Sequence, residues 1–353
     1  MWKDRHFYLV LLTGLSFGLL GVALAALGNP ENSGICISCF FENTAGSLGL
    51  HDNERMQYLR PELAGFVLGA MASALAFREF CSRGGSVPMT RFFAGFFLIV
   101  GCAVFIGCPI KLFLRMTAGD LTTLAGLAGL VGGVWAGLCS LAKGVQPGVS
   151  QSARGGSGWW VPLFFALLMI WVFLPPGFLR ESQSGGGAEH APVWISLGAG
   201  LLLGALAQRS RFCITGSLRD TFLMGHRSPL IYGLALFVLG AVAGNLIFGR
   251  FEPGFYGQPG AHLDFLWSFF GMALVGWVSV IFGGCPFRQL VKAGEGDADA
   301  GMVVLGMLVA GGLVETWGIT ATAAGVPLPG KMAVLAGFAF VFMTSLLLRE
   351  RAV

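Results

Sequence analysis

The chain has 353 residues, of which 55% are hydrophobic and only 11% are charged. Soluble globular proteins carry roughly 25% charged residues, so this composition excludes a single water-soluble core. It predicts an all-α, multi-pass membrane protein whose partner is the lipid bilayer. The net charge of +4 comes from Lys and Arg in the loops and does not suggest a nucleic-acid partner.

About ten apolar runs are long enough to form the long helices of such a fold. In chain order they are residues 7–27, 61–77, 92–107, 121–142, 160–177, 193–207, 230–249, 264–284, 301–320 and 331–348. The runs 61–77 and 193–207 are shorter than the roughly 20 residues that suit a membrane span. We therefore expect their boundaries to be the least certain.

Four shorter segments lie between the long runs, and each is interrupted by Gly, Ser or Pro. They are residues 34–47, 108–118, 211–224 and 285–293. None is long enough to cross a bilayer. Irregular backbone at membrane depth is tolerated only inside protein or beside a polar cavity, so these four segments are expected to be re-entrant.

Two cysteine motifs recur at the same distance along the chain. Cys108 and Cys285, each in a Gly-Cys-Pro sequence, are 177 residues apart, and so are Cys36 and Cys213. Separate motifs in one register indicate an internal repeat. With five crossings in each half, an odd number, the second copy enters from the opposite side, which predicts an inverted 5+5 repeat.

The repeat also sets the expected domain organisation. The first membrane repeat covers residues 1–178, with residues 160–177 as a bridging helix, and the second covers residues 193–353. We expect one integral membrane unit without a soluble domain. Loops on the N-terminal side carry 15 Lys and Arg residues against 7 on the other side, so the positive-inside rule predicts that both termini are cytoplasmic.

The Gly-Cys-Pro motifs have the residue pattern of helix starts. Proline suits the first position of a helix, and that helix would direct its positive end and free N–H groups toward the preceding cysteine sulfur. A basic residue, Lys111 or Arg288, follows two positions after each proline and adds positive charge. We interpret Cys108 and Cys285 as contacts for a soft anion. The alternative is that each cysteine is only a small residue that packs at a helix break.

Cys36 and Cys213 form the second repeated pair, and Cys39 makes a Cys-x-x-Cys sequence in the first copy alone. Such a dithiol can be a redox or metal site. The second copy has Gly216 in place of Cys39, and no histidine cluster lies nearby, so we predict no metal site and treat Cys39 as optional. The remaining cysteines, Cys81, Cys102 and Cys139, are assigned to packing.

Polar residues within or beside the apolar runs are further candidates. Asn245 and Glu315 lie inside apolar runs, where polar groups are often functional. Glu315 is near the end of its run, so the alternative for Glu315 is a side chain that simply faces water. Asp120 and Asp297 follow the short segments, and we expect both to cap the next helix.

Two stretches of the second half, Cys213–Asp220 and Gly284–Asp297, resemble signatures of the YeeE/YedE sulfur-transport family. The N-terminal copy, around Gly34–Phe40, is more similar to the YedE branch that is linked to selenium metabolism. The resemblance implies a transporter of the cell inner membrane rather than an enzyme. It would import thiosulfate or a related sulfur or selenium species by relay between cysteine thiols.

The resemblance also implies which residues carry the substrate. The substrate-carrying cysteines of the thiosulfate-transporting relatives correspond to Cys36, Cys108 and Cys285, with Cys213 at the fourth repeat position. A small cytoplasmic sulfur-carrier protein is the partner that the resemblance suggests, and no cofactor is expected. The alternative is a membrane thiol enzyme that handles sulfane sulfur or selenium through a persulfide or disulfide.

Thiols suit a soft anion on chemical grounds as well. The terminal sulfur of thiosulfate accepts hydrogen bonds poorly, and a thiol is a weak donor that matches it. Moving two negative charges into a cell against 100 mV costs about 4.6 kcal/mol, and the sequence contains no ATP-binding motif. Capture of the substrate in the cytoplasm or coupling to an ion would have to sustain import.

Overall fold

The computed structural model describes residues 4–148, 150–153 and 155–349, and the regular secondary structure of these residues is almost entirely helical. Its α-helices are α1 (Arg5–Ala26), α2 (Ile37–Ser47), α3 (Pro61–Ala76), α4 (Pro88–Phe105), α5 (Pro109–Thr117), α6 (Thr123–Ala142), α7 (Trp160–Phe173), α8 (Val193–Ser210), α9 (Ile214–Met224), α10 (Pro229–Ile247), α11 (Phe265–Phe282), α12 (Pro286–Gly294), α13 (Ala298–Thr316) and α14 (Leu328–Leu347). Two short strands, β1 (Arg83–Gly84) and β2 (Gln151–Ser152), pair antiparallel. The expected all-α, multi-pass membrane class is confirmed.

Each of the ten predicted apolar runs overlaps one long helix, and each of the four short segments overlaps one short helix. Within the described residues, eight helical segments are long and apolar enough to cross a membrane, with α4 and α5 counted together and α11 and α12 counted together. The long helices of the described chain that fall outside this group are α3, which has 16 residues, and α8, whose last turn carries Gln208 and Arg209; the short helices α2 and α9 also fall outside it. The helices α3 and α8 come from the two runs whose boundaries were expected to be the least certain.

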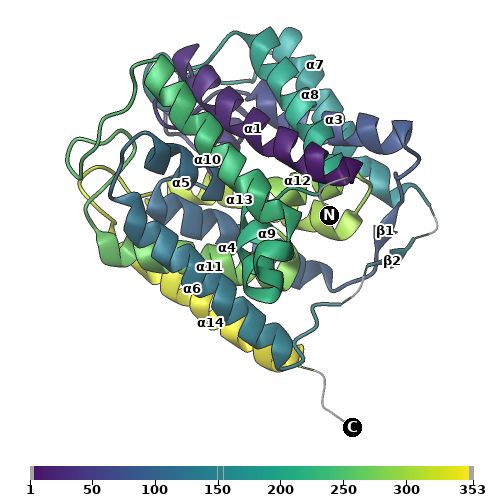
Figure 1. The fold of residues 1–353 in the computed structure, drawn as a ribbon. Helices are drawn as coiled ribbons and strands as arrows, with labels where there is room; N and C mark the ends of the chain where they lie inside the picture. Colours follow the sequence, from purple (N-terminus) through teal and green to yellow (C-terminus); the bar gives the residue numbers. More distant parts are fainter. Residues whose placement is uncertain (1–3, 149, 154, 350–353) are drawn as a thin grey trace.

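The long helices pack in close parallel pairs, which glycines permit. A Cβ at Gly14 of α1 would lie 1.9 Å from the carbonyl oxygen of Gly233 in α10. A Cβ at Gly204 of α8 would lie 2.2 Å from the carbonyl oxygen of Phe66 in α3. The pairs α4 with α13 and α6 with α11 approach in the same way, and α1 and α10 lie side by side in Figure 1. Small residues allow such backbone contact between membrane helices.

Two faces carry the helix ends. We call face I the side with residues 77–87, 143–153 and 295–297, where Cys81 N donates to Glu295 O at 3.1 Å. We call face II the side with residues 48–60, 174–192 and 317–327, where Ser182 N donates to Gln57 O at 2.8 Å. The successive long helices run alternately between these faces. The end of α14 lies on face I, because Gln146 N donates to Leu348 O at 3.0 Å.

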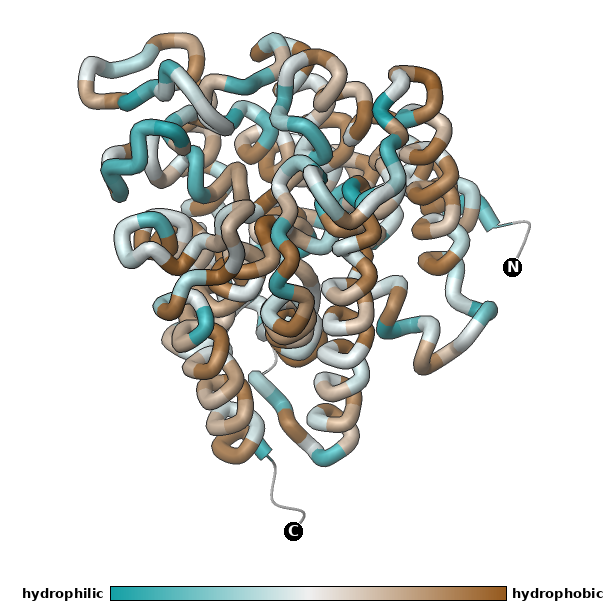
Figure 2. The backbone as a smooth tube through the Cα atoms, turned by 90° about the vertical axis from the view of Figure 1, so that its left-hand side faces the viewer, coloured by the Kyte–Doolittle hydropathy of each residue, from teal (hydrophilic) through white to brown (hydrophobic). Residues whose placement is uncertain are grey.

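Hydropathy follows this architecture. In Figure 2 the hydrophobic residues run along the long helices, while hydrophilic residues concentrate in the connecting segments. Large apolar side chains are exposed on the outer helices, such as Leu12 on α1, Leu239 on α10 and Phe342 on α14. Most residues of α4, α11 and α13 are covered by protein, so these helices form the centre.

Three of the basic residues counted for orientation, Lys3, Arg154 and Arg351, lie outside the described residues.

Candidate functional site: two thiol pairs at the starts of short helices

All four repeated cysteines are N-cap residues of the four short helices. Cys108 precedes α5 and Cys285 precedes α12, each with proline at the first helical position, as predicted. Cys36 precedes α2 and Cys213 precedes α9, and each Sγ accepts a backbone N–H three residues later at 3.4 Å. This capping by Cys36 and Cys213 was not expected from the sequence. Each sulfur therefore lies at the positive end of a helix dipole.

The four thiols are arranged in two pairs. Ile37 N, next to Cys36, donates to Cys108 Sγ at 3.3 Å. The Sγ atoms of Cys213 and Cys285 are 3.5 Å apart and hydrogen-bonded. All four cysteines are free thiols and buried. Among the described residues, no hydrogen bond joins one pair to the other, so each half of the chain builds its own thiol pair.

One cavity is lined by Cys39, three residues after Cys36, although neither Cys36 nor Cys108 lines it. A second cavity reaches Cys213 of the other pair, and the two cavities have different linings. The face II cavity has a volume of roughly 470 Å³ and is lined by Cys39, Glu42, Lys111 and Glu315 together with loop residues of face II. The face I cavity has a volume of roughly 270 Å³ and includes Cys213 in its lining. No described residue lines both cavities, so protein separates them.

Lys111 supplies a buried positive charge to the face II cavity. Its side chain comes from the first turn of α5 and is 3% exposed, and its Nζ lies 3.9 Å from Cys39 Sγ. Within the described chain, no carboxylate lies within ion-pair distance of this ammonium. Its neighbour Arg115, in contrast, pairs with Asp120 at 2.7 Å. An isolated buried ammonium favours the approach of an anion.

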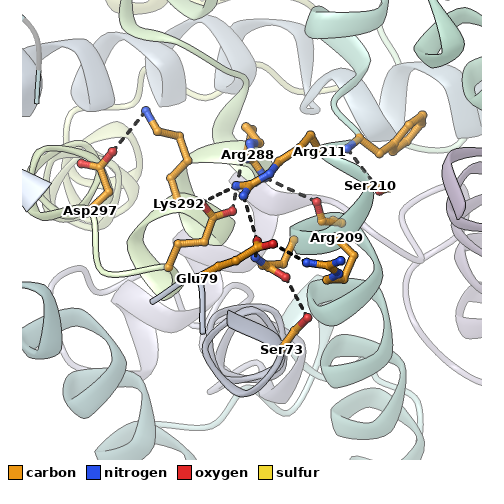
Figure 3. Close-up of polar contacts among 12 residues, drawn as sticks. Ser73, Glu79, Arg209, Ser210, Arg211, Arg288, Lys292 and Asp297 are labelled. Carbon is orange, nitrogen blue, oxygen red and sulfur yellow. Dashed lines mark hydrogen bonds and ion pairs between the residues drawn. The ribbon is translucent and has the colours of Figure 1, made fainter. Parts of the chain in front are cut away.

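Arg288, the equivalent of Lys111 in the second half, is compensated. Its guanidinium pairs with Glu295 at 3.2 Å. Glu295 also binds Arg211 at 2.6 Å, and Arg211 continues to Glu79 at 3.0 Å, where Arg209 binds as well. Figure 3 shows this chain of ion pairs, which lies beside the face I cavity because Arg211 and Arg288 both line it. The two repeated basic positions therefore differ in their electrostatic environment.

The other polar candidates have mixed outcomes. Glu315 lines the face II cavity and accepts from Asn53 Nδ2 at 2.6 Å and Thr320 Oγ1 at 2.8 Å. Asp297 caps α13 as expected, accepting from Ala300 N at 2.9 Å. Asp120 is not the N-cap of α6 as expected, because that position is Thr122; the Asp120 carboxylate instead accepts from Thr122 N at 2.9 Å and pairs with Arg115.

Asn245 is buried and donates to Thr117 Oγ1 at 3.4 Å, which places it between α10 and α5. Cys102 of α4 is fully buried in the hydrophobic core, which fits its assignment to packing. One residue near the first thiol pair escaped the sequence analysis. Glu42 lies three residues after Cys39 on α2, a spacing that brings both to one helix face. In the described parts of the chain, no group of His, Cys, Asp and Glu has the arrangement of a metal site.

Comparison with known proteins gives one informative similarity. No family model matches the chain. Over 97 residues, the chain is 30% identical to the thiosulfate transporter TsuA of Escherichia coli (strain K12). The matched segment is 28% of this chain and 27% of that transporter, so only about a quarter of the relative is covered. Together with the membrane-spanning helices, the similarity supports a membrane transporter.

Proposed function

We propose that this chain is an inner-membrane transporter that imports thiosulfate, or a related soft sulfur or selenium anion, past its cysteine thiols. The observation that carries the proposal is the buried Lys111 ammonium, which faces a cavity beside Cys39 and has no carboxylate partner in the described chain. Burying an uncompensated charge is costly. An anion in the cavity would compensate it, and Cys39 would offer it a weak hydrogen-bond donor.

The thiols favour a soft anion over sulfate. Cys36 and Cys108 lie at the starts of α2 and α5, and Cys213 and Cys285 lie at the starts of α9 and α12. Helix N-termini attract anions, while thiols donate weakly and so release a bound anion readily. We propose these four cysteines, with Cys39, Lys111 and Arg288, as the residues that the substrate meets.

We further propose that two inverted repeats, residues 1–178 and 193–353, build the path. The parallel packing of α1 with α10 and of α3 with α8 supports this symmetry, as do the matching helix starts at the four cysteines. The excess of Lys and Arg on the N-terminal side favours face I as cytoplasmic. The substrate would then enter by the face II cavity and leave by the face I cavity.

Uptake by cells that lack other importers tests this function. Labelled thiosulfate and labelled selenite would be supplied side by side to cells with the wild type, Cys108→Ala or Cys285→Ala. Uptake of one label that both variants abolish would support the proposal and identify the substrate, including the selenium link that the resemblance to the YedE branch suggests. Uptake that survives both substitutions would contradict a route past the thiols.

A membrane thiol enzyme is the second candidate, and the 3.5 Å separation of the Cys213 and Cys285 sulfurs favours it. A Cys213 thiolate could attack the outer sulfur of thiosulfate, forming a persulfide on the protein and releasing sulfite. The Cys285 thiol could then attack the inner sulfur of the persulfide, giving a disulfide and hydrogen sulfide. Intact-mass measurement after incubation with thiosulfate separates the two functions, because a transporter leaves the protein mass unchanged.

A further inference from the structure

Glu42 is a buried carboxylate without a partner at the face II cavity. Its residue is 3% exposed and lines the cavity with Cys39 and Lys111. Its backbone carbonyl contacts His51 Nε2 at 3.0 Å. Among the described residues, no hydrogen-bond donor or cation pairs with its carboxylate. Glu315, on the same cavity, has two donors instead.

The charged groups around Glu42 come from several elements. Glu315 on α13, Lys111 on α5 and Cys36 at the start of α2 interact with it electrostatically. Arg60, the N-cap residue of α3, is bound to the carbonyl oxygens of Gly186 and Glu189. On α4, Cys102 also interacts with Glu42 electrostatically. Burial and the second carboxylate both disfavour a negative charge on Glu42, while Lys111 opposes them.

We propose that Glu42 binds the proton that accompanies the anion through the face II cavity, so that transport couples a proton to the substrate. This inference rests on the proposed function. An anion that approaches Lys111 and Cys39 brings negative charge close to Glu42. Because like charges repel, a protonated Glu42 admits the anion more readily, and by reciprocity the bound anion strengthens proton binding. The proton also reduces the net negative charge that crosses the membrane.

Purified protein in liposomes provides the test, with labelled thiosulfate outside and with unlabelled thiosulfate and a pH-sensitive dye inside. Wild type should exchange external label for internal unlabelled thiosulfate, and a thiosulfate gradient should drive proton entry. The KM for thiosulfate should rise by up to about tenfold for each pH unit above the pKa of Glu42. Glu42→Gln should make KM independent of pH and abolish the thiosulfate-driven proton flux, whereas Glu42→Asp should retain both properties.

Two control variants sharpen the result. Glu315→Gln removes a negative charge next to Glu42, so the pH profile should move to lower pH. Glu31→Gln changes an exposed carboxylate of face II outside the cavity and should leave the profile as in wild type. Wild-type exchange whose pH dependence survives in Glu42→Gln would overturn the proton site alone. Absence of any thiosulfate exchange in the wild type would overturn both the transport function and the inference built on it.

Discussion

The environment of single side chains distinguishes the two halves of this chain more clearly than their motifs do. Lys111 and Arg288 occupy equivalent positions, yet Arg288 has a carboxylate at 3.2 Å and Lys111 has none within the described chain. A cation that already has a partner offers little additional attraction, whereas an unpaired buried ammonium gains from any anion that reaches it. In the proposed function, the anion-binding role therefore falls more heavily on Lys111.

Replacement of Lys111 tests this assignment. Lys111→Met keeps much of the side-chain length and removes the charge. Because hydrogen bonds to charged groups contribute about 1.5–3 kcal/mol, we expect the KM for thiosulfate to rise about 10- to 100-fold. Lys331→Met, at the first turn of α14 on the same face, is the matched control and should have a nearly unchanged KM. Equal effects of both substitutions in an uptake assay would argue against a specific site at Lys111.

Residue spacing in the sequence predicted the helix starts at Cys108 and Cys285 because proline imposes them locally. It could not predict the pairing of Arg288 with Glu295 or the isolation of Lys111, since these depend on which side chains tertiary packing brings together. Glu42 was missed for a similar reason. Its burial becomes meaningful only once α2 is known to lie within the protein.

At the scale of the helix, α8 offers an internal comparison between a packed glycine and an open one. An added Cβ at Gly204 would lie 2.2 Å from the Phe66 carbonyl oxygen of α3, whereas a Cβ at Gly198 would meet nothing within 4 Å. Inserting a methyl group into packed protein costs about 1–3 kcal/mol. Gly204→Ala should therefore lower the free energy of unfolding by at least that amount.

Gly198→Ala should leave that free energy unchanged or raise it by up to about 1 kcal/mol, because alanine favours the helix. Unfolding in detergent, followed by circular dichroism, measures both variants. A destabilised Gly198→Ala protein with a normal Gly204→Ala protein would contradict the α3–α8 packing.

The connection after α3 carries a pH-sensitive contact. Glu79 accepts from Gln208 Nε2 at 2.7 Å and pairs with Arg209 and Arg211 of the α8 end. The hydrogen bond from Gln208, followed by that from Arg209, lowers the pKa of the Glu79 carboxyl below its ordinary value. Its stabilising contribution is therefore complete above the ordinary value and is lost as the pH falls through the lowered pKa.

Thermal unfolding from about pH 6 to about pH 3 should show this loss. The wild-type melting temperature should fall more steeply with acidification than that of Glu79→Gln, which has no carboxyl to titrate. Because Glu79 is accessible to solvent, the difference should be small and should shrink in high salt. Parallel curves for the two proteins would show that this contact does not contribute.

For the whole molecule, the lengths of the apolar runs and the breaks between them predicted the long and short helices well, because the membrane requires long apolar stretches and internal backbone hydrogen bonding. The run 160–177 nevertheless ends as a helix at Phe173, before the Pro175-Pro176 sequence, which cannot continue it. Only the three-dimensional arrangement reveals two thiol pairs and two separate cavities, since it depends on how α2, α5, α9 and α12 enter the protein.

The separate cavities lead to a prediction about access from the two sides of the membrane. Cys39 lines the face II cavity and Cys213 lines the face I cavity. Variants that retain one of these cysteines, with the other seven replaced by serine or alanine, would be exposed to a membrane-impermeant thiol reagent. If face II is external, right-side-out vesicles should label Cys39 and inside-out vesicles should label Cys213. A variant that retains only Cys102, which is fully buried in α4, should remain unlabelled from either side.

Added thiosulfate should protect Cys39 from the reagent, because the anion near Lys111 would occupy the same cavity. Sulfate at equal concentration should protect less, since the thiol is a poor match for its harder oxygen atoms. Labelling of both cysteines from one side would contradict the separation of the cavities by protein. Equal protection by both anions would show that charge alone, without the thiols, determines which anion the face II cavity binds.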